Sequence, residues 1–181
     1  LGENAMFLAG KGYAVTAFDA SNAAIERNRA KARAAGSSVR FMVADATSLE
    51  GVPGGFTTVV DSAMLHCLTD EQRRTYLDGL RRVCRPAARL HVFCFQTGSA
   101  DALQMPASMD EASLRHAFRE CGWNIHRMQT RRYATMMTRR QAHEQMPEVL
   151  RENLIPDLDK QDMSEQEGVS CPVWQITARL A

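Results

Sequence analysis

The chain has 181 residues, of which 45% are hydrophobic and 24% charged, and its formal net charge is +1. This length and this balance predict a single globular domain over residues 1–181. The small net charge argues against nucleic acid or an anionic membrane as a partner, and no apolar run approaches the ~20 residues of a membrane span.

The cysteine content bears on the compartment and on metals. There are five cysteines, an odd number, and none forms a C-x-x-C pair. This usage predicts free thiols in a reducing cytoplasm, and the absence of a signal-peptide pattern at the start agrees with it. Neither Cys nor His clusters at ligand spacing, so we predict no metal site.

The first clear pattern is a strand, an acidic turn and a helix. The run Tyr13–Phe18 contains β-branched and aromatic residues, predicts a strand and is followed by Asp19. Ser21, a residue type preferred at helix N-caps, opens a predicted helix over Asn22–Ala35, and Gly36 is placed to end it. Asp19 either starts a turn, as aspartate often does, or binds the two hydroxyls of a ribose.

Two further strands end in the same way. A predicted strand over 39–44 is followed by Asp45, and one over 56–60 is followed by Asp61. The carboxyl ends of parallel strands meet at one edge of a sheet, which is where ligands bind in open α/β folds. Three aspartates at three such ends favour a cofactor-binding edge over three unrelated turns.

The remaining elements continue the alternation. Capping boxes start predicted helices at Thr69-Asp70-Glu71-Gln72 and at Ser108-Met109-Asp110-Glu111, and a strand is predicted over Arg89–Phe95. Strands over Trp123–Thr138 and Cys171–Leu180 come last, with no obvious crossover helix between them. The alternation predicts an α/β fold with a doubly wound, mostly parallel sheet and an antiparallel terminal hairpin at one edge.

At this point the sequence resembles the class I S-adenosylmethionine-dependent methyltransferases. Five short segments carry the resemblance, which extends from about Gly2 to Phe95: Gly2-Glu3-Asn4-Ala5, Ala17–Ser21, Val43–Ala46, Val60–His66 and Arg82–Leu90. The resemblance implies a Rossmann-like sheet of seven strands and S-adenosylmethionine as cofactor. Within the family the chain is similar to enzymes that methylate small molecules, such as the heterocyclic toxin methyltransferases of mycobacteria.

The resemblance also implies roles for individual residues. Asp19 and its neighbour Ala20 would meet the ribose, and Asp45 with Ala46 would meet the adenine. Other positions would lie at the first helix or near the methionine end of the cofactor: Gly2, Glu3, Asn4, Asp61 and Ser62. The first strand of the family and its glycine-rich turn should precede Gly2. We therefore expect a longer chain, in which Gly2 is the last glycine of that turn.

His66 is the candidate catalytic residue. It follows Asp61 by five residues and is placed to face the transferred methyl group, where it could take a proton from an N–H or O–H acceptor. The alternative is a histidine that only packs in the core. An apolar acceptor pocket or the core would equally well account for four large side chains: Phe95, Met105, Met109 and Trp123.

These observations predict methyl transfer to an N, O or S nucleophile of a small aromatic or heterocyclic molecule. A nicotinamide-dependent oxidoreductase is the alternative enzyme, because Asp19 would serve that ribose equally well. A cofactor-binding module without activity is the alternative of another class. The sequence identifies neither the acceptor nor the oligomeric state.

Overall fold

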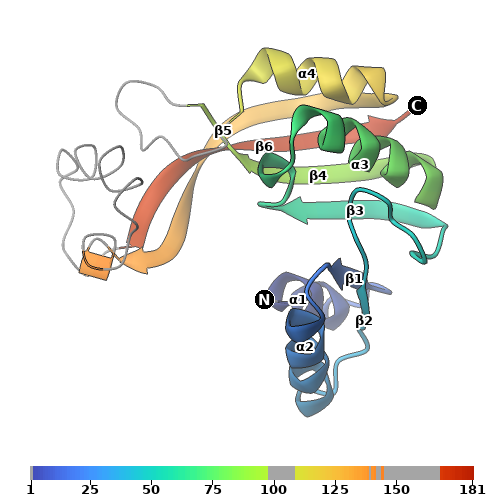
Figure 1. The fold of residues 1–181 in the computed structure, drawn as a ribbon, viewed down its shortest axis with the longest axis vertical. Helices are drawn as coiled ribbons and strands as arrows, with labels where there is room; N and C mark the ends of the chain where they lie inside the picture. The colour runs from blue at the N-terminus through green and yellow to red at the C-terminus, as the bar shows by residue number, and fades with distance from the viewer. Residues whose placement is uncertain (1, 98–108, 139, 142–143, 145–167) are drawn as a thin grey trace. The chain divides into compact units, whose positions relative to one another are not determined.

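The computed structural model describes residues 2–97, 109–138, 140–141, 144 and 168–181. The chain divides into two compact units, residues 1–54 and 55–181. Figure 1 shows helices packed on strands in both units, so the α/β class predicted from the sequence is confirmed. Among the described residues no helix is long and apolar enough to cross a membrane.

The first unit is built from two helices and two strands. Its elements in chain order are α1 (Glu3–Gly10), β1 (Thr16–Asp19), α2 (Asn22–Ala34) and β2 (Arg40–Val43). The two strands pair in parallel, with Thr16 opposite Arg40 and Asp19 opposite Val43. Because the strands are parallel and in this register, their carboxyl ends lie at the same edge.

Local signals define α2, and a small apolar cluster holds it. Ser21 is the N-cap and its hydroxyl accepts a hydrogen bond from Ala24 N at 3.2 Å. Gly36 follows the C-cap residue with φ +60°, the left-handed conformation that glycine adopts without strain. The buried cluster consists of one residue of β2 and two of α2: Phe41, Ile25 and Ala32.

The second unit contains a mixed sheet. Its elements are β3 (Phe56–Ser62), the short 3₁₀ helix η1 (Leu65–Cys67), α3 (Asp70–Val83), β4 (Cys84–Phe95), α4 (Glu111–Glu120), β5 (Trp123–Thr138) and β6 (Gly168–Leu180). The strand order is β3-β4-β6-β5, in which β3 and β4 are parallel and the other two pairs are antiparallel.

The predicted antiparallel pair at one edge of the sheet is confirmed as β6 and β5. A single, mostly parallel sheet of seven strands is not confirmed. The described strands form one sheet of two and one sheet of four, and two of the three pairings in the larger sheet are antiparallel.

Both α3 and α4 lie on the same face of the four-stranded sheet (Figure 1). They start as capped helices. Thr69 and Gln72 form the predicted capping box of α3, and Asp110 caps α4 by accepting from Ser113 N at 2.9 Å. Under them the largest buried side chain is Trp123, which is 1% exposed and donates its indole N–H to Leu77 O at 3.1 Å.

The start predicted for α4 at Ser108 is wrong, and Met109 gives the reason. Its backbone is extended and bridges to β4: Met109 N donates to Phe95 O at 2.9 Å, and Met109 O accepts from Thr97 N at 3.0 Å and from the Trp174 indole at 2.8 Å. A helix can begin only after this bridge, so the N-cap falls on Asp110. Ser108 and Met105 lie outside the described residues.

Candidate functional site

In the first unit, Asp19 and Asp45 are brought to the carboxyl ends of the paired strands. Asp19 ends β1, and its carbonyl accepts from Ala44 N at 3.1 Å, so the chain is still paired just before Asp45. Both aspartates are exposed. The prediction that these two strands end in carboxylates at one edge is therefore confirmed for this unit.

The Asp19 carboxylate stabilises a turn with one oxygen and leaves the other free for a ligand. Its Oδ1 accepts from Ser21 N at 2.8 Å and so shapes the entry to α2. Within the described residues, no hydrogen bond to Oδ2 is found. A carboxylate held through one oxygen, with the other exposed at a strand end, fits the hydroxyls of a ribose. The neighbouring Ala20 is exposed as well.

Asp45 is held more tightly than Asp19. Its Oδ1 accepts from both Thr47 N and Thr47 Oγ1, each at 2.7 Å. These hydrogen bonds lower the pKa of Asp45, so the carboxylate is charged at neutral pH. Ala46, beside it, is half-buried. An exposed, fixed anion at this position can accept hydrogen bonds from a ligand amino group.

The start of α1 contains the three other predicted positions of this unit. Gly2 is the N-cap of α1, with φ +84°, and a Cβ there would come within 3.0 Å of Asn28 Cγ. A larger residue would therefore be strained and crowded at this point. Glu3 and Asn4 are exposed, and Glu3 pairs with Lys31 Nζ at 2.9 Å, which lowers the pKa of Glu3.

In the second unit, Asp61 differs from the two aspartates above. It is 3% exposed, and its Oδ1 accepts from Met64 N at 3.0 Å and Leu65 N at 3.4 Å. Burial raises the pKa of Asp61. Its carboxylate therefore caps the turn that leads into η1. The adjacent Ser62 is exposed.

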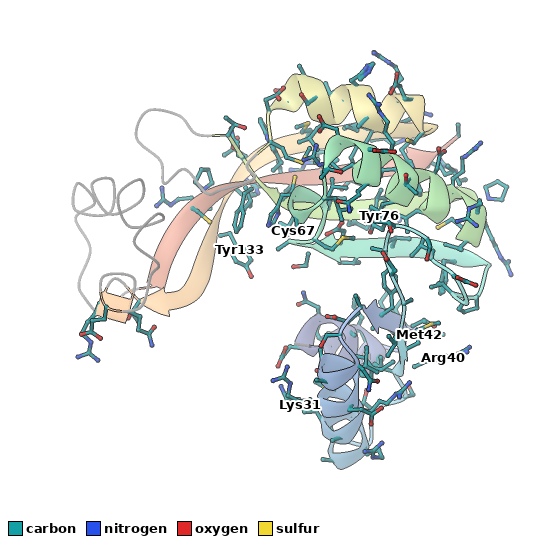
Figure 2. All side chains as sticks on the ribbon, viewed as in Figure 1. Lys31, Arg40, Met42, Cys67, Tyr76 and Tyr133 are labelled. Carbon is teal, nitrogen blue, oxygen red and sulfur yellow. The ribbon has the colours of Figure 1, made fainter. Side chains whose placement is uncertain are left out.

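The Tyr76 phenol of α3 lies against the Asp61 carboxylate (Tyr76 is labelled in Figure 2). Burial, together with the nearby negative charge, raises the pKa of the Tyr76 hydroxyl well above its ordinary value. The other carboxylate oxygen, Asp61 Oδ2, is buried and finds no partner at hydrogen-bond geometry among the described residues. This buried polar pair ties β3 to α3 beneath the turn.

The turn after Asp61 is strained and held from both sides. Ala63 has φ +70°, a conformation that a residue with a Cβ rarely adopts, and its N–H donates to Phe93 O at 2.9 Å. On the other side, Arg73 of α3 donates through Nε to Leu65 O at 3.3 Å and forms an ion pair with Asp70. These contacts fix the position of the next residue, His66.

His66 lies in η1, and its buried ring contacts Phe95, the last residue of β4. It is 5% exposed, and its Nδ1 accepts from Phe95 N at 3.5 Å. The ring also contacts the Phe95 ring, with centroids 4.2 Å apart and planes inclined by 36°. Burial, and then the charge of Arg73, lower the pKa of His66, so the ring is neutral at neutral pH.

The His66 ring lines a small, mostly apolar hollow within the second unit. The hollow also includes side chains from three strands and from the turn: Ala63, Phe93, Phe95, Tyr133 and Val173. Tyr133, labelled in Figure 2, is 41% exposed and reaches the hollow from β5. Of the apolar candidates named from sequence, Phe95 lines this hollow, whereas Met109 and Trp123 are buried in the core.

Several members of this region were not identified from the sequence as site residues. Arg73 sits inside a capped helix, where no motif marks it, and Phe93 and Tyr133 are separated from His66 by whole elements. Tyr76 lies among the buried apolar residues of α3, a pattern that indicates core and not a ligand site. Among the described residues no group of three or more His, Cys, Asp or Glu side chains is arranged to hold a metal.

Comparison with known proteins gives a consistent result. The profile of a family described as methyltransferase domain matches residues 1–87. The 2-heptyl-1-hydroxyquinolin-4(1H)-one methyltransferase of Mycobacteroides abscessus is 30% identical over 113 residues, which are 61% of this chain and 50% of that protein. The chain therefore spans about half the length of this curated relative.

Two solved structures share the fold. One comes from a study of the conversion of a disulfide bond into a thioacetal group during echinomycin biosynthesis. It is 29% identical, with a TM-score of 0.72, over 99% of this chain and 71% of that one. The other, a SAM-dependent methyltransferase of Methanosarcina mazei, is 18% identical with a TM-score of 0.71, over 99% of this chain and 87% of that one.

Together these likenesses support a class I S-adenosylmethionine-dependent methyltransferase. The family resemblance seen in the sequence and its Rossmann-like α/β fold are thereby confirmed. The segment matched by the family profile includes both exposed strand-end aspartates as well as Asp61 and His66. The residues of the first unit fit the family cofactor, because Asp19 and Asp45 present exposed acceptors at one sheet edge.

Proposed function

We propose that this chain transfers a methyl group from S-adenosylmethionine to an N, O or S nucleophile of a small aromatic or heterocyclic molecule. The observation that carries the proposal is the pair of exposed carboxylates, Asp19 and Asp45, at neighbouring strand ends within a methyltransferase domain. A single domain over residues 1–181 with a Rossmann-like sheet is part of the same proposal.

The first unit supplies the proposed cofactor-binding groups. Asp19 holds the ribose hydroxyls, with Ala20 beside it, and Asp45 with Ala46 meets the adenine. Gly2, Glu3 and Asn4 contribute the start of α1. At the end of β3, the buried Asp61 shapes the turn, and the exposed Ser62 provides the contact near the methionine end.

The second unit supplies the proposed acceptor site. When bound, S-adenosylmethionine provides an electrophilic methyl group, so the protein mainly has to align the nucleophile with it. The hollow beside His66 is bordered by Phe93, Phe95 and Tyr133, but its volume of about 10 Å³ is only that of a water molecule, so a flat ring would lie against the exposed side chain of Tyr133 at its mouth. The name of the mycobacterial relative, whose acceptor is a hydroxyquinolinone, supports a heterocyclic acceptor for this chain too.

The test is turnover of S-adenosylmethionine labelled in its methyl group. The full-length protein is incubated with hydroxyquinolinones, phenols, thiols and N-heterocycles, and the label is followed into the acceptor fraction. We expect transfer to at least one of these acceptors. Binding of S-adenosylhomocysteine by calorimetry without any transfer would instead favour an inactive cofactor-binding module, and binding of NAD in its place would favour an oxidoreductase.

A further inference from the structure

The hydrogen bond at Nδ1 of His66 decides what the other ring nitrogen can do. Phe95 N–H points at Nδ1, so Nδ1 acts as the acceptor. A neutral imidazole carries a single proton, and a ring whose Nδ1 accepts must carry that proton on Nε2. Among the described residues no hydrogen-bond partner of Nε2 is found, so its N–H is available to a ligand.

The hydrogen bond at Nδ1 runs in the opposite direction to that of a histidine general base. A catalytic histidine base donates its second N–H to a carboxylate, which orients the ring and stabilises the imidazolium that forms. Here the partner of the second nitrogen is itself a donor. Within the described part of the chain, no carboxylate hydrogen-bonds to either nitrogen of His66.

The surrounding charges also oppose a protonated ring. The titratable groups on the packed elements are Asp61 on β3, Arg73 on α3, Cys94 on β4 and Tyr133 on β5. Asp61 is turned toward its own backbone and Tyr76, and burial raises the pKa of the Cys94 thiol to about 12. The charge that acts on the His66 ring is therefore the positive charge of Arg73, which disfavours a protonated ring.

We propose that His66 offers its Nε2–H as a hydrogen-bond donor to the acceptor atom, and that the acceptor therefore reacts as its anion. This inference rests on the proposed function and narrows its substrate class to acidic hydroxy-heterocycles, phenols and thiols. The acceptor loses its proton to solvent before the methyl transfer. Its lone pair then forms the new bond to the methyl carbon while the carbon–sulfur bond of the sulfonium breaks, leaving two neutral products.

The kinetic test uses the wild-type protein and two nitrophenols of different acidity. If the acceptor reacts as its anion, the rising limb of kcat/KM against pH shifts with the acidity of the phenol. If His66 is the base, the limb stays at one pH for both phenols, and this result would overturn the inference.

Three variants separate a donor from a base. His66→Gln keeps an N–H donor but cannot act as a base, His66→Ala removes both, and the exposed His116→Gln on α4 is the matched control. We expect His66→Ala to lower kcat/KM by about tenfold to a hundredfold, the loss expected for one hydrogen bond to a charged group, and His66→Gln to recover most of it. Equal losses in Gln and Ala variants that keep wild-type melting temperatures would contradict the donor role.

A measurement without turnover keeps the two proposals apart. The ¹⁵N chemical shifts of the His66 ring, assigned by comparison with His66→Gln, report which nitrogen carries the proton. A proton on Nε2 is expected, and a proton on Nδ1 would overturn the inference even if methyl transfer is observed. Conversely, an Nε2–H ring in a protein that methylates none of the acceptors would overturn the proposed function and leave the ring assignment in place.

Discussion

Asp19 and Asp45 in the first unit are exposed, whereas Asp61 and His66 in the second unit are buried. The first pair uses part of its hydrogen-bonding capacity to shape turns and leaves the rest open to a ligand. The second pair is engaged by Met64, Leu65 and Phe95 before any ligand arrives. Strand-end aspartates of one chain can therefore differ in what they leave free: Asp19 and Asp45 keep exposed oxygens for a ligand, whereas the buried Asp61 shapes a turn.

The second unit also has the larger hydrophobic core. The cluster of the first unit has three buried residues, with Ala5, Met6, Ala17 and Val39 packed against it. In the second unit, Trp123, Phe118, Tyr76 and several leucines are fully buried under two helices. We therefore expect substitutions at the proposed site of the first unit to change binding, and substitutions in the second unit to change stability as well.

The largest effect is expected from Trp123→Ala in the second unit. The change removes a 1%-exposed indole together with its hydrogen bond to Leu77 O, and it should lower the free energy of unfolding by about 3–5 kcal/mol. Urea unfolding measures this. Tyr13→Ala, at a 61%-exposed position of the first unit, is the control and should stay within about 0.5 kcal/mol of wild type. Similar losses in both variants would contradict the difference between the units.

Asp19→Ala should affect binding instead. A carboxylate that accepts hydrogen bonds from hydroxyls has no substitute in alanine, so affinity for S-adenosylhomocysteine should fall at least about tenfold by calorimetry. The melting temperature of the ligand-free protein should hardly change, because Asp19 is exposed. Glu26→Ala removes another exposed carboxylate of the same unit, paired with Arg29, and should leave affinity unchanged. An unchanged affinity in Asp19→Ala would remove Asp19 from the site.

Thr69→Ala tests the capping box of α3, which carries Arg73 and Tyr76. Loss of the hydroxyl that accepts from Gln72 N should cost about 1 kcal/mol of stability. Thr75→Ala, on the exposed side of the same helix, is the matched control. Its hydroxyl only donates back to Glu71 O, so its loss should not destabilise the protein. Equal denaturation midpoints for Thr69→Ala and wild type would show that the cap contributes nothing.

The smallest effect is a pH dependence at Asp61. The carboxyl titrates near 3.8 in the unfolded chain, whereas burial raises the pKa in the native protein. The native state therefore binds more protons between these two values, and wild-type stability falls as pH rises through that interval. Asp61→Asn keeps an oxygen that can accept from Met64 N–H, but its amide does not titrate, so its stability lacks this pH dependence.

The stability of wild type relative to Asp61→Asn should therefore decrease from about pH 4 toward neutrality. Denaturant unfolding at a series of pH values measures the difference. A difference that is constant over this range would show that the hydrogen bonds of Asp61 offset its burial, and one that increases with pH would show that they outweigh it.

Much of the fold could be predicted because local residues specify it. Ser21 and Gly36 delimit α2, Thr69 and Gln72 start α3, and the last two strands pair as expected. Arg85-Pro86 cannot continue a helix, and α3 ends just before it, at Val83. The continuation of β4 from Cys84 through this stretch was not predicted. It depends on pairing with β3 and on an irregular register, both of which are non-local.

The candidate site was less predictable than the fold. Asp19 and Asp45 were predicted as strand-end acids, and their positions in the structure agree. Their exposure was not predicted, and their roles toward a ligand stay predictions. Nothing local distinguishes Asp61 from them, because its burial results from Tyr76 and the helix that covers it. The orientation of the His66 ring likewise depends on the Phe95 backbone, 29 residues along the chain.

The bridge between Gln96 and Met109, braced by the Trp174 indole, has a consequence for how this protein can diversify. The chain leaves β4 and returns to it at one fixed point, next to Phe95 in the wall of the hollow. Because loop-closure entropy grows slowly with length, the segment over residues 98–108 can be exchanged or lengthened at little energetic cost while its two anchors hold. Evolution, or a library of grafted segments, can thus change the chain between these two anchors without disturbing the register of the sheet.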